Sequence, residues 1–318
     1  MSSSQRVTIV TAGLLLVFLL SAVLSLRQVD HLRTGSSLQE VLYISSPKAL
    51  KRLSLGYDGL MADIYWTRAV QYFGGHHNTG NENYNLLAPL LNITTYLDPH
   101  LLVAYEFGAN FLAPPPPNGA GLPHEAIQLV ERGIRANPDK WKLYYNLGFI
   151  YYLELRDYKK AAEAFEQGSH LPDAHPAVRI LAANMAQHAG NIEMSRMLWA
   201  TTLETTPNKQ IKLNALAHLR ALQTEAEITI LGQRIDMFHQ RTGRFPVSFA
   251  ELKSAGLLAG IPVDPNGRPF KLMTGGRIEV QHPEDLPFLT MGLPPGYEPD
   301  KVPDLKNLEP MLPPDRPR

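Results

Sequence analysis

The recurrence of similar residues at intervals of 34 positions constrains the fold of this chain more than any other feature. Pro138 is followed 34 residues later by Pro172, and Phe165 is followed at the same interval by Trp199. Regular periods of this length are typical of repeat proteins, in which each unit buries its apolar face against its neighbours. The sequence therefore predicts a stack of similar units.

The best-preserved unit, residues 141–172 with the sequence "WKLYYNLGFIYYLELRDYKKAAEAFEQGSHLP", resembles a tetratricopeptide repeat. The resemblance implies two closely packed helices. We expect Gly148 to let the first helix approach the second, where Ala161 is the small residue that faces it. Phe165 is expected to fill the groove between them. The unit has one extra residue, which we expect in the turn at 156–157.

Two similar units flank this one. The later unit places Trp199 at the position of Phe165, and the earlier unit carries Gly108 in the role of Gly148. The helices of the earlier unit are separated by a loop about five residues longer than the family has. We expect Pro114–Pro117 to hold this loop extended, because consecutive prolines favour the polyproline conformation.

Together the repeats imply a mainly α fold, a TPR-type α-solenoid of about three helix pairs over residues 100–207. Such solenoids bind peptides or proteins on a concave face lined by the first helix of each pair. We expect the protein-binding residues of this face to be Tyr105, Lys142, Tyr145, Phe149, Tyr152 and Asn184. The alternative is that the aromatic side chains pack against the preceding segment.

The N-terminal region contains an uncharged apolar run of 20 residues, "VTIVTAGLLLVFLLSAVLSL" at 7–26, after a short tail at 1–6. At about 1.5 Å per residue, a helix of this length spans the roughly 30 Å hydrocarbon core of a bilayer. We expect a single-pass anchor in the inner (cytoplasmic) membrane, with the body of the protein outside the cytoplasm. A cleavable signal peptide is the alternative, and the basic residues on both sides leave the orientation open.

Residues 27–99 predict a helical N-terminal cap for the repeats. Within it, Asp58 and Asp63 lie in an apolar helix, while His76 and His77 are adjacent in a polar loop. A metal-dependent hydrolase would use such carboxylates or bind a metal at the histidines, but no nucleophile or further ligand follows at a recognisable spacing. We expect charge pairing and a solvated loop, and hence no enzymatic activity, no cofactor and no metal site.

A second helical region, residues 208–240, follows the repeats. Its apolar residues recur every three or four positions, which predicts a helix that caps the last repeat, with Asn208 as its N-cap. Gly243 is expected to end this helix. Ser248 and Glu251 then predict a short helix that begins with a capping box.

Residues 241–293 predict a compact helix-plus-hairpin module whose prolines fall at turns. Part of it, 243–270, resembles the C-terminal module of type II secretion pseudopilins, through Gly243, Phe245, Pro246, Ser248, Leu252, Pro262, Asp264, Pro265, Gly267, Pro269 and Phe270. The N-terminus lacks the prepilin processing signature, so the resemblance implies a docking or capping fold of the cell envelope. We expect Asp264 and Pro265 to form a turn; Ca²⁺ binding by Asp264 is the lesser alternative.

The last segment, residues 294–318, holds eight prolines and predicts a polyproline-like or disordered tail.

Composition narrows the function further. Lys plus Arg and Asp plus Glu each number 30, and there is no cysteine. No basic surface for nucleic acid is therefore expected, and thiol chemistry and disulfides are excluded. The sequence as a whole predicts a membrane-anchored scaffold for protein partners in the assembly of a cell-envelope complex of the secretion, pilus or electron-transfer type. A periplasmic chaperone-like binder of client polypeptides is the alternative.

Overall fold

The computed structural model describes residues 13–25, 27, 46–80, 83–300 and 303–313. The chain divides into two compact units, unit 1 at residues 1–136 and unit 2 at residues 137–318. Both are mainly helical, and strands among the described residues form one two-stranded sheet in unit 2. The predicted mainly α fold with a small α+β C-terminal part is confirmed at this level.

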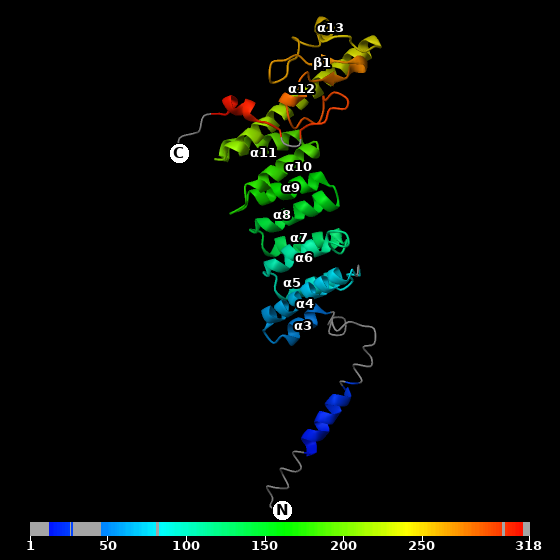
Figure 1. Cartoon of the computed structure of the whole chain (residues 1–318), viewed down its shortest axis with the longest axis vertical. Coiled ribbons are helices and arrows are strands. Elements are labelled where there is room, and N and C mark those ends of the chain that lie inside the picture. The colour runs from blue at the N-terminus through cyan, green and yellow to red at the C-terminus, as the bar shows by residue number, and fades with distance from the viewer. Residues whose placement is uncertain (1–12, 26, 28–45, 81–82, 301–302, 314–318) are drawn as a thin grey trace, which may run out of the picture. The chain divides into compact units, whose positions relative to one another are not determined.

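Unit 1 holds a stack of helices (Figure 1), namely α3 (Pro47–Leu53), α4 (Asp58–Thr79), α5 (Leu87–Leu97), α6 (Leu102–Leu112) and α7 (Pro123–Ala136). α4 packs along α5, and α6 packs along α7. Gly108 lies where these layers meet, because a Cβ atom there would lie 2.9 Å from side-chain atoms of both Leu91 and Leu129. Gly108 therefore permits the close helix approach that the sequence predicts.

A further helix occupies residues 13–25, and most of its apolar side chains are exposed. Among the residues that the structure describes, no helix is both long enough and apolar enough to cross a membrane. Residues 7–12 and 26 of the predicted anchor lie outside the described residues.

The loop between α6 and α7 folds back on the end of α6, so the extended conformation predicted for Pro114–Pro117 is wrong. The carbonyl oxygens of Phe111 and Leu112 accept hydrogen bonds from the backbone N atoms of Ala120 (2.9 Å) and Leu122 (2.7 Å). The last carbonyls of a helix have no partner within it. The returning loop supplies the missing donors, and this requirement overrides the local preference of the prolines.

Unit 2 begins with helices that pack in chain order (Figure 1), namely α8 (Trp141–Phe149), the π-helix η1 (Ile150–Glu154), α9 (Tyr158–Ser169), α10 (Ala177–His188) and α11 (Ile192–Thr205). Gly148 lies against the ring of Phe165, because a Cβ atom there would be 2.5 Å from Phe165 Cε1. The predicted role of Gly148 is present, with Phe165 as the facing side chain in addition to the buried Ala161.

The π-helix η1 contains the extra residue of this repeat, so the position predicted for it in the turn at 156–157 is wrong. Leu155 N donates to Ile150 O at 3.3 Å, the five-residue spacing of a π-turn. Before the π-turn, the position of the chain is fixed by Gly148, which packs on Phe165. After the π-turn, it is fixed by Asp157, which caps α9 and accepts from Lys160 N at 3.0 Å. The surplus residue between these two positions widens the helix.

The long helix α12 (Lys209–Thr242) is continuous and packs on α11. Asn208 caps it as predicted, since its side-chain oxygen accepts from Ile211 N at 3.1 Å. Gly243 ends it with a left-handed φ of 74°, a conformation that glycine adopts without steric cost.

The C-terminal module packs on the second half of α12. It consists of α13 (Phe249–Ser254), β1 (Lys271–Leu272), the 3₁₀ turn η2 (Thr274–Gly276), β2 (Ile278–Glu279) and the 3₁₀ turn η3 (Pro283–Asp285). β1 and β2 are antiparallel. The shared core contains Ile228, Leu231, Ile235 and Phe238 of α12 and Phe249, Leu252, Phe270, Ile278 and Val280 of the module.

The cap of α13 differs slightly from the predicted capping box. Ser248 Oγ accepts from Glu251 N at 3.3 Å, as predicted. The Glu251 carboxylate, however, accepts from Val247 N at 2.8 Å, one residue before the position that a capping box uses.

Part of the predicted tail is ordered, which corrects the expectation for residues 294–318. Residues 303–313 include the 3₁₀ helix η4 (Lys306–Met311), and Leu305 and Leu308 are buried against α12. Glu309 forms an ion pair with Lys209 at 2.7 Å. Leucines spaced three residues apart supply enough apolar surface to fix the segment despite its prolines.

A buried aromatic stack joins the repeats to the C-terminal module. The His218 ring lies between Trp199, at a centroid distance of 4.1 Å, and Phe288, at 3.9 Å. Gln187 Oε1 accepts from His218 Nδ1 at 3.3 Å. Phe288 adopts a φ of 73°, which is strained for a residue with a side chain, so the surrounding contacts must hold it there.

The same network satisfies a buried carboxylate. Glu225 Oε1 accepts from the backbone N and the Oγ1 of Thr290, at 2.6 and 2.7 Å. Gln187 Nε2 donates to Phe288 O at 3.2 Å and approaches Glu225 Oε2 at 3.5 Å. These hydrogen bonds connect α10, α12 and the loop after η3 to one another.

We expect His218 to make the stability of the protein depend on pH. Burial, together with the charge of His188, lowers the pKa of His218 from 6.5 to about 3. The unfolded chain takes up a proton near pH 6.5, whereas the folded chain keeps the imidazole neutral. Stability is therefore full above pH 6.5 and falls below it, by about 2 kcal/mol between about pH 7 and pH 5.

Urea denaturation at several pH values tests this, with His218→Phe as the matched variant that keeps the stack. Its free energy of unfolding should decline less over the same range than that of the natural chain. Equal declines would show that His218 titrates alike in both states.

We also expect opposite effects from the same substitution at two helical glycines. Gly148→Ala should destabilise the protein by about 1–3 kcal/mol, because the added methyl group would overlap Phe165. Gly232→Ala, in α12, has nothing within 4 Å of the new methyl group. It should stabilise by about 0.5–1 kcal/mol through helix propensity. Urea denaturation of both variants checks this, and equal effects would contradict the close packing of α8 on α9.

Candidate protein-binding surface

A row of aromatic side chains runs along the first helix pair of unit 2. We call it the aromatic strip, and it consists of Trp141, Tyr145 and Phe149 on α8, Tyr152 in η1 and Tyr158 at the start of α9. Successive rings are in contact, with centroid distances of 5.9, 4.7, 6.3 and 6.1 Å. All five side chains are half-buried.

The strip rests on Phe165 of α9. The ring of Phe165 lies 6.1 Å from that of Tyr145 and 5.2 Å from that of Phe149, edge-on in both contacts. Because Phe165 is itself fully buried, it fixes the inner edges of these rings while their outer edges stay accessible. Edge-to-face pairs of this kind are favourable beyond the area they bury. The strip is therefore a preformed aromatic surface.

The strip passes through the π-turn, in which Tyr152 lies. Tyr152 contacts Phe149, three residues earlier, and Tyr158, at the start of α9. Tyr158 in turn reaches His188 at the end of α10, at 5.5 Å between ring centroids. Single π-turns inside helices occur frequently at functional sites.

Three of the predicted binding residues, Tyr145, Phe149 and Tyr152, belong to the strip. Lys142 is exposed and lies three residues before Tyr145, so the helix places both on one face. Asn184 is half-buried on α10. The structure therefore brings four of the six predicted residues together on α8 and η1.

Tyr105 is in a different environment, in the core of unit 1. Its side chain is fully buried, and a Cβ atom at Gly133 of α7 would lie 2.8 Å from its ring. Burial raises the pKa of its hydroxyl, with an opposing effect from Arg132. It therefore offers no surface to a partner and instead packs α6 on α7. In the sequence, Tyr105 is a large residue on the first helix of a repeat. That position suits both a residue that binds a partner and a residue that packs two helices together, so it does not distinguish them.

The charges near the second half of the strip are engaged within the protein. Lys160 Nζ lies 5.3 Å from the centroid of the Tyr151 ring and 3.5 Å from Asp157 Oδ2. Partial desolvation raises the pKa of Glu154, at the end of η1. Exposed pairs of this kind contribute little to stability. The strip thus presents aromatic surface with a cation, Lys142, near its first half.

A second aromatic cluster, which is not among the predicted sites, lies in unit 1. Phe111 of α6 stacks on Phe73 of α4 at 4.2 Å and on Trp66 at 6.2 Å. Phe107, one turn earlier on α6, is 50% exposed. The spacing of Trp66 and Phe73, and of Phe107 and Phe111, places each pair on one helix face. That spacing could have indicated the cluster.

Three of the residues considered for hydrolysis, Asp58, His76 and His77, have structural contacts. Asp58, at the start of α4, accepts from Ser54 Oγ and lies 4.0 Å from Lys51 Nζ. The predicted loop position of His76 and His77 is wrong, because both lie in the last turn of α4. Their Nδ1 atoms lie 2.8 Å from the carbonyl oxygens of Tyr72 and Pro117. In the part of the chain that the structure describes, no three His, Asp or Glu side chains are grouped to hold a metal ion.

Asp264 organises the turn that the sequence predicts. Its Oδ1 accepts from the backbone N atoms of Asn266 (2.8 Å) and Arg268 (3.0 Å). Its own backbone N donates to Arg268 O at 2.7 Å. Side-chain acceptance from the residue two positions on is the Asx-turn arrangement. Pro265 stands at the next turn position, and Pro246, of the same module, is buried.

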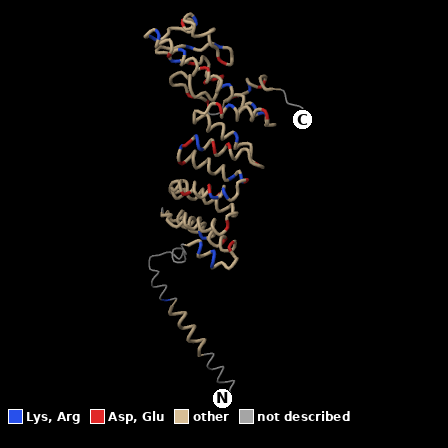
Figure 2. Tube along the Cα trace, turned by 180° about the vertical axis from the view of Figure 1, so that it is seen from behind, with Lys and Arg blue, Asp and Glu red and all other residues tan. Residues whose placement is uncertain are grey.

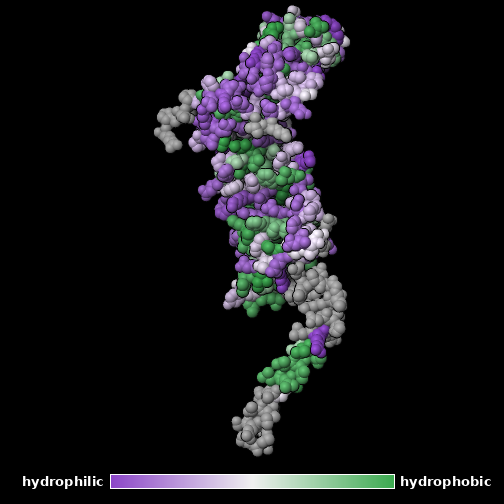
Figure 3. Space-filling model, in the orientation of Figure 1, coloured by the Kyte–Doolittle hydropathy of each residue, from purple (hydrophilic) through white to green (hydrophobic). Residues whose placement is uncertain are grey.

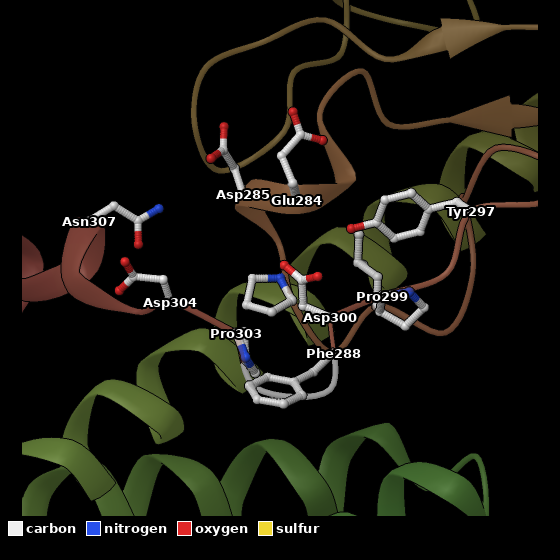
Figure 4. A pocket seen from close by; sticks show the side chains of 11 residues that line it. Glu284, Asp285, Phe288, Tyr297, Pro299, Asp300, Pro303, Asp304 and Asn307 are labelled. Carbon is white, nitrogen blue, oxygen red and sulfur yellow. The ribbon is translucent and has the colours of Figure 1, made fainter.

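An acidic cavity of about 540 Å³ lies between η3 and residues 297–300 and 303–307 (Figure 4). The carboxylates that line it are Glu284, Asp285, Asp300 and Asp304. Asp285 pairs with Arg268, and Glu284 pairs with His282. Burial and the nearby Glu284 and Asp300 raise the pKa of Tyr297 on its wall. We assign no site to it, because its carboxylates are partly paired and no observation points to a ligand.

Comparison with known proteins adds little to these contacts. No family model matches the chain, and none of the curated protein sequences matches it. One solved structure that is similar is a thermophilic TPR protein from Thermus thermophilus. The two chains are 19% identical, the match covers 55% of this chain and 99% of that chain, and the TM-score is 0.32. A likeness at this score carries no argument, so the account of the helix pairs rests on their packing.

Proposed function

We propose that this protein is a non-enzymatic scaffold that binds a partner protein through the aromatic strip. The observation that carries the proposal is the continuity of five half-exposed rings over α8, η1 and α9, supported from below by Phe165. Rigid aromatic side chains lose little conformational entropy on binding, and they are the residues that most often dominate interface energies.

An extended apolar segment fits this surface best. Proline-rich and other extended segments bind to surfaces lined by aromatic rings, with little ordering of their own backbone. Lys142 lies on the same helix face as Tyr145 and is exposed, which favours a partner segment with an acidic residue near its apolar part. The partner is therefore a protein with an apolar or proline-bearing segment next to a carboxylate.

The proposal extends to location. Residues 7–26 would anchor the chain in the inner (cytoplasmic) membrane, and the two units would act outside the cytoplasm in the assembly of a secretion, pilus or electron-transfer complex. The uncharged run at 7–26 and the exposed apolar side chains of residues 13–25 support the anchor. The pseudopilin resemblance of residues 243–270 supports the envelope.

Peptide selection tests the proposal. The full chain should select one consensus from a displayed peptide library, and Tyr152→Ser should weaken its binding at least about tenfold, because hot-spot aromatics contribute more than about 1–2 kcal/mol. Lys142→Glu should weaken peptides that carry the acidic residue. Fluorescence anisotropy measures the dissociation constants.

Tyr297→Ser is the matched control, because Tyr297 is also half-buried in unit 2 but lies outside the strip. It should bind the peptide as the natural chain does. Unchanged binding by Tyr152→Ser, or an equal loss in both variants, would refute the assignment of the strip. Weak binding of many unrelated sequences would instead favour the chaperone-like alternative.

A further inference from the structure

Unit 1 exposes an unusual apolar surface where α3 meets α4. We call it the α3–α4 face, and it contains Leu53, Leu55, Tyr57, Leu60 and Ile64, with exposed fractions of 66, 85, 70, 59 and 40%. Figure 3 shows hydrophobic side chains on the surface at this end of unit 1. Scattered apolar residues are ordinary on a protein surface, but a contiguous group indicates an interaction site.

The loop at the centre of the face is structured to expose its leucine. Leu55 has a φ of 50°, a left-handed conformation that is uncommon for a residue with a side chain, and Gly56 follows with a φ of 94°. Ser54 fixes the loop, since its Oγ donates to Lys51 O at 2.8 Å and its carbonyl accepts from Tyr57 N at 2.8 Å. An exposed leucine in a strained turn contributes nothing to the core of unit 1, which suggests a role in binding.

Cations border the apolar side chains. Three cations are exposed on α3, namely Lys48, Lys51 and Arg52. Figure 2, in which Lys and Arg are blue, shows basic residues at this end of unit 1. Lys51 is partly engaged, because it lies 4.0 Å from Asp58 and over the ring of Tyr96. Asp63, on α4, is the other carboxylate nearby. Lys48 and Arg52 thus leave α3 with positive charge beside an apolar loop.

This combination fits a bilayer surface better than a protein groove. Leucine and tyrosine side chains bind at the level of the headgroups and upper acyl chains, while Lys and Arg beside them attract anionic lipids. Proximity provides a second argument, which rests on the membrane anchor of the proposed function. The 20 residues at 26–45 separate the apolar helix at 13–25 from α3, and they reach at most about 70 Å when fully extended.

We propose that the α3–α4 face docks on the surface of an anionic lipid bilayer. Leu55 and Tyr57 enter the interfacial layer, and Lys48 and Arg52 lie against lipid phosphates. Docking of this kind would hold unit 1 against the membrane at a second point besides the anchor.

The absence of cysteine allows a direct test with the full chain. Leu55→Cys and, as the control, Gln128→Cys on the exposed face of α7 each accept one environment-sensitive fluorophore. The proteins are reconstituted in vesicles of phosphatidylcholine, alone or mixed with phosphatidylglycerol. Emission from position 55 should shift to shorter wavelength as phosphatidylglycerol increases, and nitroxide-labelled lipid should quench it. Emission from position 128 should not change.

Charge variants of the labelled Leu55→Cys chain sharpen the test. Lys48→Gln with Arg52→Gln should weaken docking by about fivefold for each charge removed. Lys159→Gln with Lys253→Gln, at exposed lysines of unit 2, should leave it unchanged. Flotation of the vesicles reports the anchor separately, so anchoring and docking can fail independently.

Three results would overturn the inference. The first is an emission from position 55 that does not respond to phosphatidylglycerol. The second is a shift that Lys48→Gln with Arg52→Gln does not weaken. The third is a shift that grows with protein density rather than with lipid charge, which would identify a second copy of the chain as the occupant.

Discussion

The contact between Gly148 and Phe165 is the constraint on which the proposed binding surface depends. Because no side chain separates α8 from α9 at this point, the Phe165 ring can reach both Tyr145 and Phe149 and fix their inner edges. The same close approach fixes the start of α9, at Asp157, relative to α8. The surplus residue between Gly148 and Asp157 then widens the helix into the π-turn, in which Tyr152 lies.

The rest of unit 2 is organised by α12, which is longer than the repeat helices. Its first half holds η4, and its second half forms the core of the C-terminal module. Between them, His218 stacks with Trp199 of the last repeat and Phe288 of the module. The cost of burying the Glu225 carboxylate is offset by its hydrogen bonds to Thr290. The ring stack and these hydrogen bonds join the repeats to the module.

Local rules predicted much of this fold. Caps at Asn208 and Ser248, and the close-packing role of Gly148, follow from residue type and spacing alone, because each depends on a few neighbouring backbone groups. The burial of Tyr105 and the position of the π-turn could not be predicted in this way, since both depend on which side chain lies across the interface. The order of residues 303–313 likewise requires the apolar surface of α12.

The central claim is that the aromatic strip contacts the partner, and site-specific photocrosslinking tests it most directly. A benzophenone side chain is introduced at Tyr152, and in a second variant at Tyr297, each in the full chain with the selected peptide. The account predicts a crosslinked product from position 152 and none from position 297. Crosslinking from position 297 alone, or none from position 152 while the peptide remains bound, would contradict it.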